Sequence, residues 1–143
     1  MTDDSLQAGF SLVELMVALA IAAFIAAFAV PSYRDHALRG QLPEMSSALQ
    51  LGALRLEQYY QDFRSYRNGD LCGITLPDSD RFVLRCTSPD DGQSFLLTAR
   101  GSGALTDFAY TIDHLGQTRT IALPPTWGPA PRDCWILKRG ATC

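Results

Sequence analysis

The sequence predicts an α+β protein in which a long N-terminal helix packs on an antiparallel sheet of about four strands. Two observations lead to this prediction. An apolar run over residues 10–30 continues into an amphipathic stretch over residues 31–63, and short apolar-rich runs separated by turn residues follow in residues 64–143. A chain of 143 residues, 47% hydrophobic and 19% charged, has room for one soluble domain after this helix.

The apolar run of residues 10–30 has only Ser11 and Glu14 as polar members. As a helix rising about 1.5 Å per residue it would be about 31 Å long, which matches a hydrocarbon core of about 30 Å. We therefore expect a single-pass membrane helix. The alternative is a secretory signal peptide cleaved after Ala29, which would leave Val30 as the first residue. The length of the run, its acid and the lack of Lys or Arg before it argue against that alternative.

Glu14 needs a partner, because an acid near the centre of a membrane helix costs about 2.5–3.5 kcal/mol, and somewhat less near the end. Cleavage between Gly9 and Phe10 would create an amine four residues before this carboxylate. The amine could belong to the same chain or to a neighbour. Packing such helices side by side would neutralise both charges.

The segment from Gly9 to Leu15, the unbroken apolar helix and Pro31-Ser32-Tyr33 together resemble the N-terminus of type IV pilins and their pseudopilin relatives. The resemblance implies the type IV pilin fold. It implies that a prepilin peptidase cuts after Gly9 and N-methylates Phe10, and that Glu14 guides each subunit into register in a filament. The leader, residues 1–9, differs from the family in having two Asp and no Lys or Arg, and a longer basic leader is one explanation.

The same resemblance implies partners and a location. The partners are other pilin subunits, major and minor, the peptidase and N-methyltransferase, and the assembly machinery of the inner membrane. The precursor is expected in the bacterial inner membrane with its head in the periplasm. After assembly, the chain is expected in an extracellular pilus.

Residues 31–63 are expected to form the amphipathic half of the helix. Pro31 and Pro43 each lack a backbone donor and should kink or locally break it. Gly52 falls within the apolar stripe, where it suits either a close approach of the sheet or a merely tolerated glycine. The stripe consists of Leu38, Leu42, Met45, Leu49, Leu56, Tyr59 and Phe63.

The globular head is expected over residues 64–143. A turn at Asn68-Gly69-Asp70 precedes four runs that have the composition of strands. Turn residues separate the runs, which favours a meander. The runs cover residues 82–86, 95–99, 108–112 and 118–123.

The four cysteines all follow the apolar run, and their spacing does not match the close pairs of zinc sites. Two disulfides in an oxidising compartment are expected, and the spacing leaves all three connectivities open. The ending from Cys134-Trp135 to Cys143 resembles the termini of PilE-like minor pilins. That resemblance implies a disulfide-stabilised C-terminal region with the pairs Cys134–Cys143 and Cys72–Cys86, and a minor subunit.

No enzyme, metal site or cofactor is expected, because His36 and His114 lie near neither a ligand pattern nor a nucleophile motif. The formal charge is −3 and rises to −1 when the two acids of residues 1–9 are removed, so the chain is not basic. DNA contact is therefore possible but not favoured. The candidate contact residues are the cluster Arg132, Lys138 and Arg139.

The resemblance to type IV pilins implies a structural subunit of a type IV pilus, and the PilE-like ending implies a minor pilin, in a filament for motility, adhesion or DNA uptake. Three alternatives stay open. The first is a pseudopilin of a type II secretion system. The second is a DNA-binding minor pilin for natural transformation, and the third is a secreted binding domain released by ordinary signal cleavage.

Overall fold

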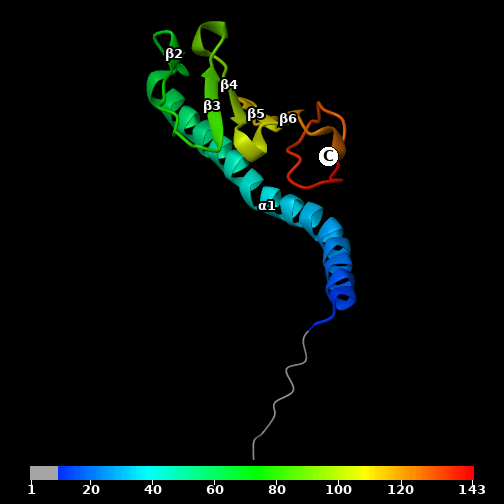
Figure 1. Ribbon diagram of the computed structural model, residues 1–143. Coiled ribbons are helices and arrows are strands. Elements are labelled where there is room, and N and C mark those ends of the chain that lie inside the picture. Colours follow the sequence, from blue (N-terminus) through cyan, green and yellow to red (C-terminus); the bar gives the residue numbers. More distant parts are fainter. Residues whose placement is uncertain (1–9) are drawn as a thin grey trace, which may run out of the picture. The chain divides into compact units, whose positions relative to one another are not determined.

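The computed structural model describes residues 10–143, apart from the side chains of residues 29–32, 34, 35 and 90. The predicted leader and its cleavage residue Gly9 lie outside the described residues. The chain divides into two compact units, Met1–Arg34 and Asp35–Cys143. A single helix, α1 (Leu12–Phe63), runs from the first unit into the second (Figure 1).

The start of α1 is fixed by a capping residue. The Glu14 backbone N–H donates to Ser11 Oγ at 3.2 Å, and the Leu15 N–H donates to the Ser11 carbonyl at 3.2 Å. Ser-x-x-Glu is the sequence of a capping box, which satisfies backbone donors that a helix leaves free at its first turn. The helix continues through Pro31 and Pro43, so neither proline ends it. A kink at these prolines stays a prediction.

Four strands form one antiparallel sheet in which each strand pairs with the next in sequence. This confirms the predicted meander and the α+β class, with strand ends shifted by one or two residues. A register shift beside Ala109 and Tyr110 marks a bulge between the last two strands. The strands are β3 (Phe82–Thr87), β4 (Leu96–Gly101), β5 (Ala109–Asp113) and β6 (Thr118–Ala122).

A small hairpin that the sequence analysis did not predict precedes this sheet. Its strands are β1 (Arg67–Asn68) and β2 (Leu71–Cys72), joined by Gly69 and Asp70 at the expected turn. Gly69 has φ of +63°, a conformation that glycine adopts without steric cost. Strands of two residues are too short to show alternation, so only their turn was visible in the sequence. Three short 3-10 segments complete the fold: η1 (Asp90–Gly92), η2 (Gly103–Leu105) and η3 (Pro125–Trp127).

The core of the second unit lies between the C-terminal half of α1 and one face of the sheet. A Cβ placed on Gly52 would lie 3.0 Å from Leu97 Cδ1, so this glycine lets α1 approach β4 closely. Of the two interpretations of Gly52, the structure supports the close approach. The fully buried members of this core include Leu42, Met45, Leu49 and Leu56 from α1 and Leu97, Ala99 and Tyr110 from the sheet.

Phe63 is an exception to the predicted stripe. Its side chain is 63% exposed, because it is the last residue of α1 and the chain turns away at Arg64, which has φ of +56°. The ring stacks on Tyr59 with centroids 4.4 Å apart. The apolar stripe therefore reaches the core through its middle members, and the exposed Phe63 packs on Tyr59 of its own helix.

Candidate assembly surface

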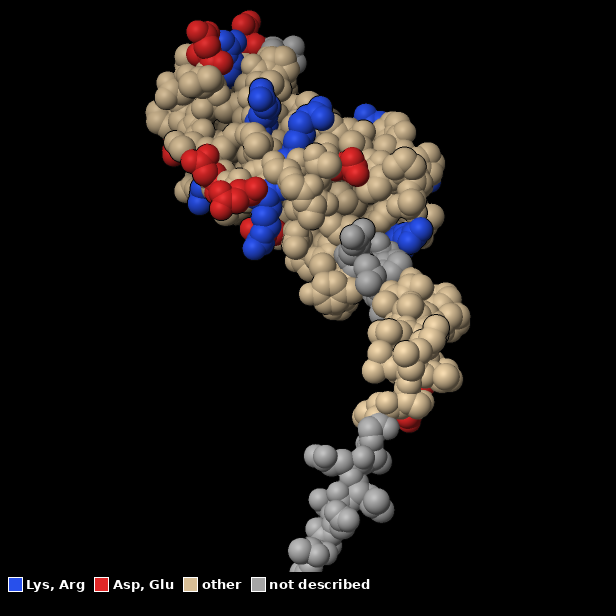
Figure 2. Space-filling view, in the orientation of Figure 1, with Lys and Arg blue, Asp and Glu red and all other residues tan. Residues whose placement is uncertain are grey.

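The N-terminal part of α1 presents an unbroken apolar surface. Over residues 10–28 every large apolar side chain is at least 54% exposed, and Phe10 reaches 81%. In Figure 2 this part of the helix is almost entirely tan. An exposed apolar surface of this extent on a chain marks contact with another protein or with lipid. We call residues 10–28 the apolar helix segment.

Glu14 lies at the first turn of α1, where the positive end of the helix dipole favours a carboxylate. The Glu14 residue is exposed, as is Phe10, and its side chain has no ion pair within the described part of the chain. Both are open to a neighbouring molecule. The roles predicted for Gly9, Phe10 and Glu14 in cleavage, methylation and register stay predictions.

Within residues 10–143, as far as the structure describes them, no helical stretch is both long and apolar enough to cross a membrane.

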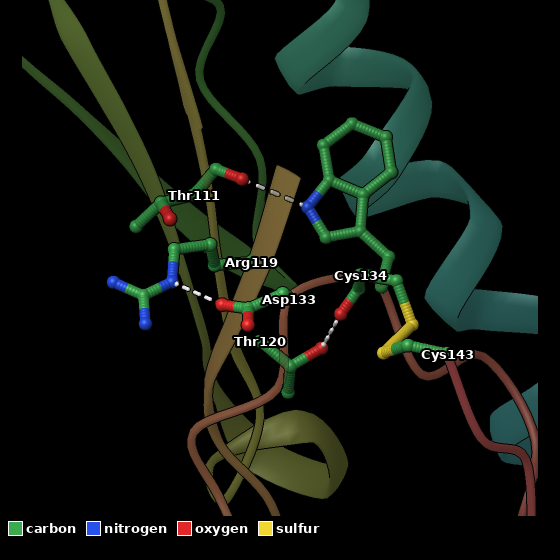
Figure 3. A network of polar contacts seen from close by, with 7 residues as sticks. Thr111, Arg119, Thr120, Asp133, Cys134 and Cys143 are labelled. Atoms are coloured by element: carbon green, nitrogen blue, oxygen red, sulfur yellow. Dashed lines mark hydrogen bonds and ion pairs between the residues drawn. A yellow bond between two sulfur atoms is a disulfide. The ribbon is translucent and has the colours of Figure 1, made fainter. Parts of the chain in front are cut away.

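The C-terminal segment is held against the sheet by Thr120, which makes four hydrogen bonds. Its backbone exchanges two bonds of 2.9 Å with Arg132, extending the sheet beyond β6. Its Oγ1 donates to the Cys134 carbonyl at 2.6 Å and accepts from the Ile136 N–H at 3.0 Å. Figure 3 shows this threonine beside the Cys134–Cys143 disulfide. Sequence reasoning missed Thr120, because a threonine in a strand carries no signal of such a role.

Two aromatic side chains complete this attachment. Trp135 Nε1 donates to the Thr111 carbonyl at 2.9 Å, and the Tyr110 hydroxyl donates to the Ile136 carbonyl at 2.6 Å. Tyr110 is fully buried, and burial raises the pKa of its hydroxyl. The C-terminal segment is thus part of the core rather than a loose tail.

A second tyrosine joins α1 to the segment that follows it. Burial and, next to it, a hydrogen bond of 2.9 Å from its hydroxyl to Glu57 Oε1 raise the pKa of Tyr66 to about 12. The neutral hydroxyl is the form that can donate this bond. The contact fixes the turn where the chain leaves the helix for the hairpin.

Both disulfides join the pairs that the resemblance implies. Cys72–Cys86 links β2 to β3, and Cys134–Cys143 closes the C-terminal segment on itself. No cysteine among the described residues is free. In the chain-entropy model, short loops such as these stabilise a fold by roughly 2–3 kcal/mol each, which is useful for a small head.

The basic cluster considered for DNA contact is partly engaged within the chain. Arg132 Nε donates to the Pro129 carbonyl at 3.1 Å, and Arg139 Nε donates to the Thr126 carbonyl at 3.0 Å. These bonds order the C-terminal loop, while Lys138 is exposed. Contact of the cluster with DNA stays a prediction.

Among the residues that the structure describes, His36 and His114 belong to no cluster of metal-ligating side chains. The His114 backbone N–H donates to the Phe95 carbonyl at 3.2 Å, and its ring lies 6.5 Å from the Phe95 ring. His36 is exposed on α1. Across the described residues, no group of three or more His, Cys, Asp or Glu side chains is placed to hold a metal ion.

The start of the chain and the fold both have counterparts among known proteins. Residues 4–30 match the family model of the prokaryotic N-terminal methylation motif. A type IV pilin from Shewanella oneidensis has a similar fold, with a TM-score of 0.51 and 21% identity over 69% of this chain and 98% of that one. The fold and the motif define a chain of the type IV pilin class.

Sequence similarity to two relatives covers more than half of this chain. A type IV major fimbrial protein FimA of Dichelobacter nodosus is 35% identical over 109 residues, covering 76% of this chain and 58% of that protein. A type IV major pilin protein PilE1 of Neisseria gonorrhoeae is 32% identical over 77 residues, covering 54% and 36%. The chain belongs to the type IV pilin family. It spans about half the length of the curated relatives it matches.

Proposed function

We propose that the chain is a structural subunit of a type IV pilus, made as a precursor that its N-terminal helix holds in the inner membrane. A prepilin peptidase cuts after Gly9 and methylates the amine of Phe10. The mature chain joins a filament by packing its apolar helix segment against those of other pilins. The observation that carries this proposal is the exposure of that segment, because such a surface needs a lipid or protein partner.

Assembly, rather than catalysis, is the activity of this subunit. The methylation motif supports the processing step, and the disulfide-closed head suits a chain that works outside the cytoplasm. Glu14, at the exposed start of α1, supplies the carboxylate that pairs with the Phe10 amine of an adjacent subunit. The filament then serves motility, adhesion or DNA uptake.

We further propose a minor subunit, on the strength of the Cys134-Trp135 ending. The relatives named above are major pilins, so the abundance of the chain decides this point. Quantitative mass spectrometry of sheared filaments is the measurement. A few copies per filament would support a minor subunit, and a chain forming most of the filament mass would contradict it.

The processing step is tested by the intact mass and first residue of the chain from sheared filaments and from the native membrane fraction. We expect a chain that starts at N-methylated Phe10 in the filament fraction. A chain that starts at Val30 would instead indicate a secreted domain. An uncut chain that stays in the membrane would indicate a simple anchor, and either result would contradict the proposal.

A further inference from the structure

The face of the sheet turned away from α1 carries exposed side chains of an unusual mixture. Leu84 and Leu97 point to the core, so the alternating residues of β3 and β4 point outward. The outward residues include Val83, which is 51% exposed, and Leu96, which is 40% exposed. We call this surface the outer sheet face. Its other exposed members on β3 and β4 are Arg85, Arg100 and Thr87.

The two arginines of the outer sheet face are close neighbours without carboxylate partners. The register places Arg85 opposite Thr98 and Arg100 opposite Val83, so the two side chains are diagonal neighbours on adjacent strands. Neither forms an ion pair with any residue that the structure describes. Like charges in such positions repel each other. Blue side chains stand near one another over the sheet in Figure 2.

Arg119 shows what a compensated arginine on this face looks like. It lies in the same cross-strand row as Arg85, and its Nε lies 2.9 Å from Asp133 Oδ1. Within the described sheet, the neighbouring pair on β3 and β4 lacks this compensation. An anionic group outside the chain would supply it.

The composition of the face favours a protein as the source of that group. Arginine beside exposed aliphatic side chains is typical of protein interfaces, where arginine is enriched and often contributes most to binding. The second unit itself, residues 35–143, contains twelve acids and eleven bases, so a second copy can supply carboxylates. A nucleic acid would meet a unit of slightly negative charge.

The chain has an acidic surface of its own at one end of the sheet. Asp78 and Asp80 lie in the segment before β3, and Asp107 lies in the connection from β4 to β5. The Ser102 N–H donates to the Arg81 carbonyl at 2.7 Å, which brings these two loops together. The three carboxylates are exposed and, among described residues, form no ion pair. We call them the acidic loops.

We propose that the outer sheet face docks on the acidic loops of a second copy of this chain, with Arg85 and Arg100 pairing with those carboxylates. This rests on the proposed pilus function and on copies of this chain lying next to one another in the filament, whatever their total number, because it specifies how their heads meet. The two surfaces are different patches of one molecule, so the contact is heterologous. Heterologous contacts that do not close into a ring repeat along an open helical filament.

A charge-swap experiment in the pilus-forming cell tests this contact. The first variant combines Arg85→Glu and Arg100→Glu, and the second combines Asp80→Lys and Asp107→Lys. We expect each to lower the amount of this chain in sheared filaments about tenfold or more, since like charges then meet across the contact. The variant that carries all four changes should recover most of the wild-type amount. Arg55→Glu on α1 is the matched control, and the acidic-loop changes should not alter its effect.

Folding and function are checked separately. Membrane levels of each full-length variant report on folding, and all changed side chains are exposed. Wild-type filaments should also release subunits more readily at high ionic strength, since salt screens exposed ion pairs. Unchanged incorporation of the arginine variant, or no recovery in the fourfold variant, would overturn the proposed contact while leaving the pilus function intact.

Two further outcomes identify other causes. Loss of duplex DNA retention by the arginine variant, with filament incorporation unchanged, would show that the outer sheet face binds a nucleic acid and would overturn the contact. Absence of the wild-type chain from sheared filaments would overturn the proposed function and the contact together.

Discussion

Tyr110 joins the sheet to the C-terminal segment through one buried hydroxyl. Tyr110→Phe would leave the Ile136 carbonyl without its donor, and an unsatisfied buried group costs about 1–3 kcal/mol. We expect the free energy of unfolding to fall by about that amount. Denaturant unfolding of the full chain in detergent is the measurement. Tyr33→Phe is the control, because Tyr33 is 74% exposed, and an equal loss in both variants would contradict the role of the hydroxyl.

The same tyrosines make stability depend on alkaline pH. An unfolded tyrosine has a pKa of about 10. The pKa of Tyr110 is raised by burial and that of Tyr66 is raised to about 12, so the folded chain keeps these protons longer than the unfolded chain. Their contribution is complete below about pH 10 and is lost as pH rises through the folded values. Melting temperatures between pH 8 and 11 should fall above pH 10, and less steeply in Tyr110→Phe.

At the scale of an element, α1 contains two glycines with opposite surroundings. A Cβ on Gly52 would meet Leu97 at 3.0 Å, whereas a Cβ on Gly40 would meet nothing within 4 Å. Gly52→Leu should therefore lower the free energy of unfolding by about 1–3 kcal/mol through overpacking. Gly40→Leu should raise it by about 0.5–1 kcal/mol, because leucine is the better helix former. Similar changes in the free energy of unfolding at both sites would show that helix propensity alone determines the effect, and would contradict overpacking at Gly52.

The elements with periodic patterns were the predictable part of this fold. The apolar stripe and the four strand runs each repeat over several residues, so local sequence predicted α1 and β3 to β6. The hairpin of β1 and β2 has two residues per strand and left only its turn as a signal. Phe63 fits the stripe by its spacing, but its side chain is exposed because α1 ends there and the chain turns away at Arg64. The spacing alone could not predict this end.

At the scale of the whole molecule, one part of the candidate site could be predicted from local sequence and another part could not. Ser11 and Glu14 lie three residues apart, so the start of the helix could be identified from a local motif. The attachment of the C-terminal segment joins Thr120 to Ile136 and Tyr110 to the same residue across the sheet. The arginines of the outer sheet face meet through strand register. Neither arrangement can be derived without the pairing of the strands.

Glu14→Ala is the prediction that concerns the complete assembly. Cleavage after Gly9 should proceed, because the peptide bond is five residues before the change. Filaments should contain about tenfold less of the variant, since the Phe10 amine of the adjacent subunit loses its counter-ion. Sheared filament yield and the mass of the membrane-bound chain measure the two steps. A wild-type yield from Glu14→Ala would contradict the assembly role, and Ser11→Ala, which removes only the helix cap, is the control.

The two disulfides limit how far the head can lengthen when a filament is pulled. They close loops with sequence separations of 14 and 9 residues. At about 3.3–3.6 Å per extended residue, the two loops would be roughly 50 Å and 30 Å long when stretched. The disulfides keep the ends of each loop together, so tension cannot add these lengths to the head. The sheet pairs only consecutive strands, so a strand detached under load recovers its partner through a short connection. Such a head would yield by a restricted length and re-form when the load falls.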